Sequence, residues 1–478
     1  MKTHSGSSAF MIYTIIGIAS AVISFVTMIV LTRTSSESFF GQINKFIAAS
    51  NVIMSLICLG FDSAYIRFYY EPPESSNSKQ LAWKCMTPAL AIFLLISFVI
   101  ILFRNNPSLE LLLGGGGLIF AMAFVITVLS QFLNRFMTIY FRMSGKILSF
   151  SIVSIAFALL TKTIFIPTLH ITQKFADNII IAAVFLTAFM SSYFLFNAKN
   201  IIEIPQQSMV SYKPVYRYAL YSSPVFAITY LNNYLPQVII SRNLGDNALG
   251  IYSAALLFGS AILVLSTGFS TFWSPYMFKN YKTERETIKK VHDVVLFGSV
   301  FVMALILIFN DFIYLFIGEA FRRNQNILGM LLLYPIIIII VDTVAYGISI
   351  EKKNEISLAI YAISTVTNVV LCLLLISRFE LGGVAIASMI SAIVQMLLMT
   401  YFGQKYYRSI NHIRRTLFHM FVLIFSAISF YLLYDNRSIF VIVEIAMLAI
   451  CFIYDRNVIL WSIKLVKTGK ILGIGQKK

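Results

Sequence analysis

The sequence predicts an all-α polytopic membrane protein with about 14 transmembrane helices. Of its 478 residues, 59% are hydrophobic and only 12% are charged, a composition far outside that of soluble domains. The apolar residues gather in runs of about 20, which is the length that a helix needs to cross a bilayer. These runs are continuous rather than alternating, so helices are favoured over a β-barrel.

Each predicted span is one of these apolar runs, and they follow one another along the whole chain. The first run is too long for a signal-peptide core and lacks a small-residue cleavage site, so we expect it to remain as a span. In order, the runs lie near residues 9–32, 41–60, 86–103, 111–131, 147–167, 178–197, 217–240, 249–272, 294–317, 327–350, 356–377, 382–402, 416–434 and 438–454.

An internal repeat relates the two halves of the chain. LTRTSSESFFGQIN at 31–44 and ISRNLGDNALGIYS at 240–253 align without a gap at an offset of 209 positions. The alignment pairs Arg33 with Arg242, Glu37 with Asp246 and Gly41 with Gly250. With six spans in each copy, the second copy has the same orientation as the first, which predicts a pseudo-twofold axis along the membrane normal.

The repeat also predicts how the chain divides. We expect two parallel six-helix lobes, a linker between them, and a pair of helices outside the repeat. The predicted ranges are an N-terminal lobe at 1–200, a cytoplasmic linker at 201–216, a C-terminal lobe at 217–404, and two extra helices with a basic cytoplasmic tail at 405–478.

The net charge of +17 reports membrane topology rather than nucleic-acid binding. Alternate loops and tails hold 27 Lys and Arg on one side and 10 on the other. By the positive-inside rule, both termini are cytoplasmic. The tail at 455–478, with five Lys, indicates an inner (plasma) membrane surface. The basic side also attracts anionic membrane lipids.

Residues suited to catalysis or metal binding are sparse. Three of the four cysteines fall inside spans, so no disulfide framework is implied. The five histidines show no metal-ligand grouping, and we expect His412 and His419 at the membrane interface. Gly114 to Gly117 lack the Gly-Lys-Ser/Thr that a phosphate loop requires. We therefore predict that the protein is not an enzyme and has no catalytic residues, metal or cofactor.

Polar residues follow one face of several spans. In the second span Asn44, Asn51, Ser55 and Asp62 lie at helical spacing among large apolar residues. In the seventh span, Asn233 lies on a similar polar face. Such stripes turn away from lipid, toward a bundle interior or a water-filled cavity. Hydrogen bonding between helices is the alternative explanation.

Four segments resemble a known family: SESFFGQIN at 36–44, LGFDSAYIRFYYE at 59–71, YSSPVFAITYLNNYLPQVIISRNLGDNALGIYSAALLFG at 221–259 and FSTFWSPYMF at 269–278. They resemble the Wzx-type flippases of O-antigen and capsular polysaccharide repeat units, which belong to the multidrug, oligosaccharidyl-lipid and polysaccharide exporter superfamily. The resemblance implies a ligand that is an undecaprenyl-diphosphate-linked oligosaccharide, carried to the outer leaflet by alternating access. Many relatives have an Asp-Arg pair where this chain has Pro236-Gln237, so a coupling role for that acid does not carry over.

A diphosphate ligand directs attention to basic side chains, because guanidinium groups pair with phosphate oxygens. Arg33 and Arg242 have an alternative role, in which they only extend to the outer interface. The predicted substrate-binding residues are Arg67, Arg33, Arg242, Lys45, Asn51 and Asn233.

Three acids near or inside spans are candidates for ion coupling: Asp342, Glu444 and Asp62. An unpaired ionised acid inside the membrane costs about 2.5–3.5 kcal/mol. Each should therefore be protonated, paired or in contact with water. Binding of a coupling Na+ or H+ and a structural hydrogen bond both satisfy this requirement.

Three other functions compete with the flippase. A drug or metabolite antiporter of the same superfamily would share the fold but favour acids in the cavity. A polytopic glycan polymerase or ligase would need a large outer loop, which the sequence lacks, and the polar stripes disfavour a passive scaffold. The expected partners are the polyprenyl-diphosphate-linked glycan, membrane lipids and other polysaccharide-assembly proteins, with no nucleic acid.

Overall fold

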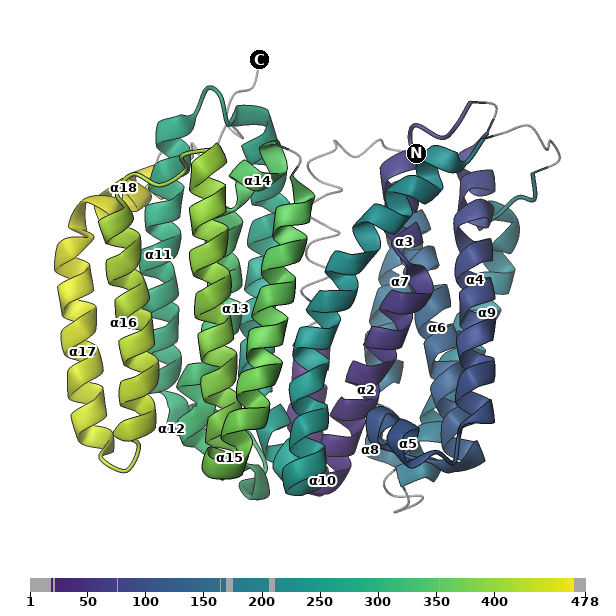
Figure 1. Cartoon of the computed structure of the whole chain (residues 1–478), viewed down its shortest axis with the longest axis horizontal. Coiled ribbons are helices and arrows are strands. Elements are labelled where there is room, and N and C mark those ends of the chain that lie inside the picture. Colours follow the sequence, from purple (N-terminus) through teal and green to yellow (C-terminus); the bar gives the residue numbers. More distant parts are fainter. Residues whose placement is uncertain are drawn as a thin grey trace. The chain divides into compact units, whose positions relative to one another are not determined.

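The fold is known from a computed structural model that describes residues 19, 22–74, 76–163, 165–168, 175–205, 211–351 and 353–467. Figure 1 shows that long helices make up nearly all of this part of the chain. No strand occurs among the described residues. The predicted all-α class is therefore confirmed.

Nine helices of the described chain are long and apolar enough to cross a membrane, or ten if one bent pair counts as a span. Two of them exceed a single crossing: α10 (Lys213–Asn280) and α15 (Asn354–Tyr406). Each is interrupted by one non-helical residue, Gly245 in α10 and Glu380 in α15. An unbroken helix of 53 residues would be about 80 Å long, against about 30 Å of hydrocarbon. The multi-pass membrane fold is confirmed, while the count of fourteen spans stays a prediction.

The chain forms two compact units. The first contains Met1–Ala254 and Ile317–Phe321, and the second contains Ala255–Phe316 and Arg322–Lys478. The boundary at Ala254 lies inside α10, one residue after the end of the second copy of the repeated stretch. The four domain ranges drawn from the repeat stay a prediction.

The first unit is a helical bundle around α6 and α9, which pack along each other. Its core is rich in aromatic rings: Phe46 of α2 meets Phe120 and Phe124 of α6 edge-on, at centroid distances of 5.6 and 5.3 Å. Its elements, before the start of α10, are the helix Val22–Thr34, α2 (Glu37–Cys58), α3 (Phe61–Phe68), α4 (Ser78–Leu102), α5 (Pro107–Leu113), α6 (Gly117–Met143), α7 (Ile147–Ala158), the π-helical η1 (Leu159–Thr163), α8 (Phe165–Thr168) and α9 (Phe175–Ile201).

The break between α2 and α3 bends the second predicted span by 58°. Leu59 and Gly60 have φ angles of 38° and 76°, in the left-handed region that ends a helix. The polar stripe of Asn51 and Ser55 therefore does not continue to Asp62 on one helical face. Asp62 instead begins a separate short helix.

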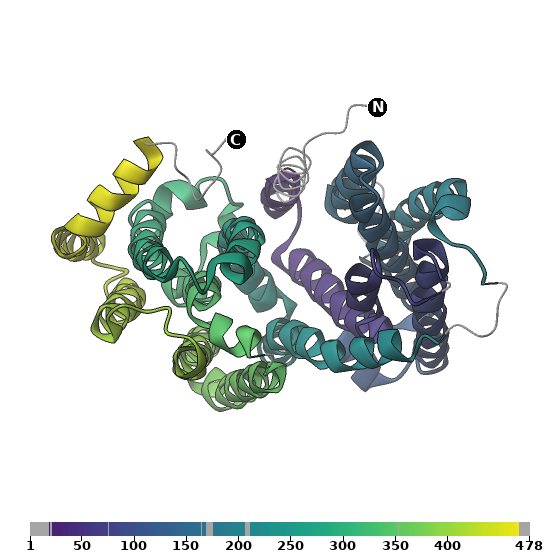
Figure 2. The same ribbon diagram turned by 90° about the horizontal axis from the view of Figure 1, so that it is seen from above.

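The second unit packs around α13, the most buried of its spans. The last helix, α18, follows α17 directly; in Figure 2 this yellow helix is seen from the side while its olive neighbours are seen end-on. Besides the second part of α10 and α15, the unit contains α11 (Arg285–Ile308), α12 (Asn310–Tyr314), the 3-10 turns η2 (Glu319–Arg322, shared with the first unit) and η3 (Gln325–Ile327), α13 (Leu328–Val344), α14 (Tyr346–Ile350), α16 (Ile413–Leu432), α17 (Arg437–Tyr454) and α18 (Arg456–Lys467).

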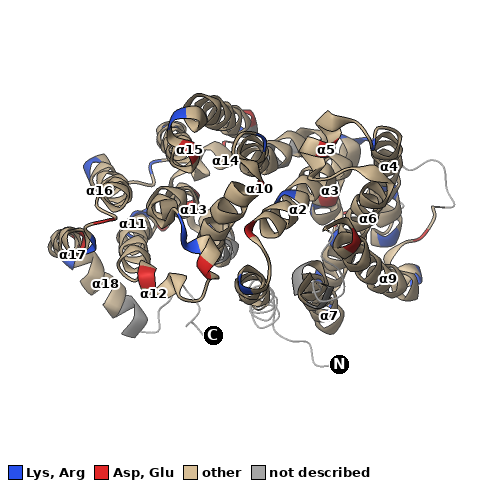
Figure 3. Ribbon diagram, turned by 90° about the horizontal axis from the view of Figure 1, so that it is seen from below, with Lys and Arg blue, Asp and Glu red and all other residues tan. Residues whose placement is uncertain are grey.

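The outer faces of the spans are apolar. Leu94, Leu95 and Phe98 of α4 are 60–64% exposed, and Val366 and Leu374 of α15 are 61% and 66% exposed. Figure 3 shows the same property, because charged residues are few along the ribbons of the spans. Exposed large side chains of this kind are favourable in lipid and unfavourable in water.

Candidate functional site

The candidate site is a cavity of about 460 Å³ inside the first unit. This volume lies within the usual range of small-molecule sites, about 300–1,000 Å³. Its walls come from five parts of the bundle: the helix Val22–Thr34, α2, α6, the α7–η1–α8 segment and α9. The lining residues are Ser24, Phe46, Ile47, Asn51, Thr127, Gln131, Asn134, Ser154, Phe157, Ala158, Leu160, Thr161, Phe165, Ile179, Ala182, Ala183 and Leu186.

Helical spacing brings the polar part of this lining together. Thr127, Gln131 and Asn134 lie four and three positions apart on α6, so they share one face, and Asn51 joins them from α2. Ser24, Ser154 and Thr161 add hydroxyl groups, and the rest of the lining is aliphatic and aromatic; none of its described residues is charged. Such a wall suits an uncharged ligand with polar substituents.

A local widening of the helix forms part of the wall. The α7 helix passes into the π-helical turn η1, whose Leu160 and Thr161 line the cavity. π-Turns are rare and often occur at functional sites. The Thr161 hydroxyl donates to the Phe157 carbonyl at 2.6 Å, so its polar group is satisfied within its own helix.

An ion pair joins α6 to α3, and its arginine follows the cavity residue Asn134 in the sequence. Arg135, next to Asn134 in sequence, donates from Nη2 and Nε to Oδ2 of Asp62, at 2.6 and 2.8 Å. Asp62 is buried, whereas the Arg135 side chain is 47% exposed. The break at Leu59 and Gly60 sets the position of Asp62 at the start of α3. The coupling candidate Asp62 therefore has a cationic partner in this conformation.

The two copies of the repeated stretch pack directly on each other within the first unit. Gly41 and Gly250 stand where α2 and α10 cross. A Cβ on Gly250 would lie 2.0 Å from the carbonyl oxygen of Glu37, and one on Gly41 would lie 2.3 Å from that of Asp246. No side chain fits such a gap, so both positions require glycine.

A buried ion pair lies at the same crossing. Lys45 is 3% exposed, and its Nζ donates to Ser241 Oγ at 2.6 Å and Asp246 Oδ1 at 3.2 Å. Asp246 also accepts from Gln42 Nε2 at 3.0 Å and from Ser241 Oγ at 2.5 Å. The predicted phosphate ligand Lys45 is thus neutralised by an acid that the repeat alignment pairs with Glu37.

The predicted arginines lie on exposed surfaces. Arg67 pairs with Glu71, four residues later, with Nη1 at 3.0 Å from Oε2, and both side chains are more than half exposed. Arg33, Arg242 and Asn233 are also exposed. Of the six predicted substrate-binding residues, only Asn51 lines the cavity of the first unit.

The other two coupling candidates lie in the second unit. Glu444 of α17 is 1% exposed; its Oε1 accepts from Ser426 Oγ at 2.9 Å, and its Oε2 has no hydrogen-bond partner in the described chain. Asp342 of α13 is half-buried and hydrogen-bonds Ser270. Each of these two acids has a hydroxyl neighbour. This arrangement fits both a structural hydrogen bond and a protonatable site.

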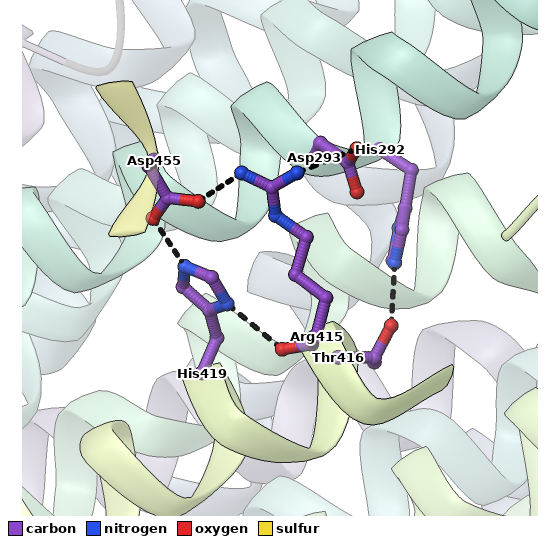
Figure 4. A network of polar contacts seen from close by, with 6 residues as sticks. All are labelled: His292, Asp293, Arg415, Thr416, His419 and Asp455. Carbon is purple, nitrogen blue, oxygen red and sulfur yellow. Dashed lines mark hydrogen bonds and ion pairs between the residues drawn. The ribbon is translucent and has the colours of Figure 1, made fainter. Parts of the chain in front are cut away.

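A charged cluster that sequence reasoning missed fixes the ends of α11, α16 and α17 (Figure 4). Arg415 lies between Asp293, at 3.1 Å, and Asp455, which also accepts from His419 Nε2 at 2.7 Å. His419 Nδ1 lies 2.8 Å from the Arg415 carbonyl oxygen. Both ring nitrogens of His419 therefore lie within hydrogen-bond distance of oxygen atoms.

Asp455 is the part of this cluster that lies just outside the spans. Burial alone would raise the pKa of its carboxyl, but hydrogen bonds from His419 and Arg415 hold the pKa below the ordinary value of 3.8. Nearby, the fully buried His292 bonds Thr343 Oγ1 and Thr416 Oγ1 at 2.7 and 3.0 Å. Among the described residues no group of His, Cys, Asp or Glu is arranged to hold a metal ion.

Solved structures with a similar fold are membrane proteins. The lipid II flippase MurJ in an inward closed conformation is 15% identical, with a TM-score of 0.67 over 94% of this chain and 100% of that one. An inward-facing multidrug resistance MATE family transporter of the MOP superfamily is 14% identical, with a TM-score of 0.58 over 82% of this chain and 97% of that one. A MOP superfamily transporter from Pyrococcus furiosus is 16% identical, with a TM-score of 0.55 over 85% and 98% of the two chains. At these identities the likeness concerns the fold.

The sequence comparisons concern the family itself. A search of curated protein sequences finds no significant match. The family model described as "Polysaccharide biosynthesis protein" matches residues 8–281, which is more than half of the chain and includes both copies of the repeated stretch. The chain therefore belongs to the polysaccharide biosynthesis protein family.

Proposed function

We propose that this protein is a flippase that moves undecaprenyl-diphosphate-linked oligosaccharide repeat units from the cytoplasmic to the outer leaflet, for surface polysaccharide biosynthesis. The observation that carries the proposal is a cavity inside a membrane bundle of this family, whose described lining combines uncharged polar side chains with a larger apolar surface. A glycan head group is too polar to cross hydrocarbon unaided, whereas a polyprenyl tail is stable in lipid. The cavity within the bundle therefore has to hold only the head group, while the tail stays in lipid.

The diphosphate needs cationic partners, and none occurs among the described residues that line the cavity of the first unit. Arg67 is our first candidate, because its ion pair with Glu71 is exposed and such pairs are weak. Arg33 and Arg242 follow as exposed, repeat-related arginines. Lys45 comes last, because a phosphate would have to displace Asp246 from it.

We place the protein in the inner membrane with both termini cytoplasmic, and we propose that it works by alternating access. In a cell that is negative inside, each elementary charge crossing the full potential gains about 2.3 kcal/mol per 100 mV. Outward movement of a diphosphate is therefore favoured by the field. Asp342, Glu444 and Asp62 are the residues that we propose for binding a coupling Na+ or H+.

A cation-coupled drug antiporter is the runner-up function. It is supported by the buried acids Glu444 and Asp62 and by the fold shared with MATE transporters. It is disfavoured by the cavity of the first unit, because no acid that could attract a cationic drug occurs among its described lining residues. A glycan polymerase is a weaker alternative.

Reconstituted protein tests the proposal. Proteoliposomes that contain a fluorescent undecaprenyl-diphosphate-linked oligosaccharide are exposed to a membrane-impermeant quencher, which reports the fraction of head groups in the outer leaflet. We expect the protein to exchange head groups between leaflets, faster under a potential that drives anions in the assay direction. Exchange no faster than in protein-free vesicles, together with uptake of a cationic dye against a Na+ or H+ gradient, would favour the antiporter instead.

A further inference from the structure

The wall of the cavity contains two amide oxygens that lack hydrogen-bond partners. Gln131 Oε1 and Asn134 Oδ1 are both buried and unpaired within the described chain. The other end of the Gln131 amide is engaged, because its Nε2 donates to Ser50 Oγ at 2.7 Å. The two residues are three positions apart on α6 and both line the cavity.

These oxygens determine what kind of ligand atom fits beside them. A buried acceptor without a partner is costly, and only a group that donates a proton removes the cost. Sugar hydroxyls and acetamido N–H groups are donors. An ionised phosphate has acceptors only, and no cation among the described lining residues would offset its burial.

The rest of the wall agrees with this selection. Asn51, Thr127 and Ser154 add further polar side chains, while Phe157 and Phe165 add flat apolar surface. A sugar ring presents both kinds of surface, hydroxyl groups at its edge and C–H groups on its faces. The volume of about 460 Å³ admits a small saccharide, and an acyl tail would leave the polar part of the wall unpaired.

We infer that this cavity is a binding site for the uncharged sugar portion of the ligand, recognised through donation to Gln131 and Asn134, and that the diphosphate binds elsewhere. The inference rests on the proposed flippase function and adds the ligand class that this cavity selects. In this arrangement, unlike in a uniformly basic cavity, sugar and phosphate are recognised by separate parts of the protein.

Thiol protection in the full-length protein tests the site. The four native cysteines are buried, so a Thr161→Cys variant places an additional thiol in the cavity wall that a small maleimide can label. The probes are methyl glycosides of common hexoses and N-acetylhexosamines, compared with inorganic pyrophosphate. We expect at least one glycoside to slow labelling, and pyrophosphate to leave the rate unchanged.

Variants in the Thr161→Cys background identify the recognising groups. Gln131→Met removes the acceptor at similar volume, and the concentration of glycoside needed for protection should rise about tenfold, as expected for one lost hydrogen bond. Asn134→Leu provides a second test if the first variant does not fold. Ser130→Ala is the matched control, because Ser130 is fully buried next to Gln131 and bonds Thr187 at 2.6 Å but does not line the cavity.

The outcomes separate this inference from the proposed function. Protection by pyrophosphate as strong as by any glycoside, no protection by the whole glycoside panel, or unchanged protection in both cavity variants would each overturn the sugar site, even if lipid-linked glycan is still flipped. Specific glycoside protection in a protein that flips nothing would support the site and reject the flippase.

Discussion

The crossing of α2 and α10 gives the sharpest prediction about stability. In Gly250→Ala the new Cβ would lie 2.0 Å from the Glu37 carbonyl oxygen and 2.7 Å from its carbon. Real Cβ contacts are not shorter than about 3.0 Å, so the two backbones must separate by about 1 Å. Neither backbone can rotate away as a side chain could. The variant must therefore disturb the packing on both sides of the crossing.

The size of the effect follows from two opposing terms. Overpacking costs about 1–3 kcal/mol or more, and contact between two backbones belongs at the upper end. Alanine regains up to about 1 kcal/mol of helix propensity. We expect a net loss of about 2 kcal/mol in the free energy of unfolding, which lowers the Tm by about 2–4 °C for a chain of this size.

Thermal unfolding in detergent, followed by size-exclusion chromatography of the heated full-length protein, measures this shift. Gly41→Ala should act in the same direction, because its Cβ meets the Asp246 oxygen at 2.3 Å. Gly298→Ala in α11 is the control, since no heavy atom lies within 4 Å of its Cβ position. Equal Tm values for Gly250→Ala and the control would refute the backbone contact at this crossing.

Three further variants test the polar contacts. Lys45→Met should lower the free energy of unfolding by about 3 kcal/mol, since it leaves Asp246 without its cation. Adding Asp246→Asn should restore part of the loss. If the double variant loses as much Tm as Lys45→Met alone, the pairing is contradicted. Asp455→Leu should also lower the free energy of unfolding, because it removes one of the two acids that pair with Arg415 and the partner of His419 Nε2. In the parent protein, the contribution of Asp455 to the free energy of unfolding is present above pH 3.8 and is lost as the pH falls through the lowered pKa. A Tm that declines near neutral pH would therefore not come from this group. Arg67→Ala should impair glycan export at normal protein abundance, and full export would remove it as a phosphate ligand.

The fold was largely predictable because hydrophobic length and loop charge are local properties of a sequence. The repeat was visible for the same reason: Gly41 and Gly250 stand in equivalent, similarly patterned stretches. The structure adds what the alignment could not supply, that the two stretches contact each other. Contact between residues 209 positions apart depends on how whole helices pack, and no local pattern records it.

The site was less predictable, since the partners of polar residues are set by tertiary packing. Asn51 was found from its helical stripe, and it does line the cavity. Gln131 and Asn134 were missed because they are neither charged nor part of the quoted motifs, although with Thr127 they share one face of α6. That spacing was the available signal.

The partners of charged residues could not be predicted where they are distant in sequence. Lys45 stays a predicted phosphate ligand, and the structure adds its acid, which lies 201 residues away. His419 is fully buried against Asp455, 36 residues away, a contact that its sequence neighbourhood did not indicate. Helical spacing predicts which residues share one face of a helix. It does not predict which other helix or side chain packs against that face.

The contacts at the glycine crossing also have a symmetry that bears on mechanism. Gly250 meets Glu37, and Gly41 meets Asp246; the repeat offset exchanges one contact for the other. Two contacts that exchange in this way are related by a local twofold rotation, as a parallel repeat requires. The side chains break this symmetry, because Lys45 pairs with Asp246 and its repeat equivalent is Ala254. The ion pair between Lys45 and Asp246 therefore has no counterpart at the position that the repeat relates to Lys45.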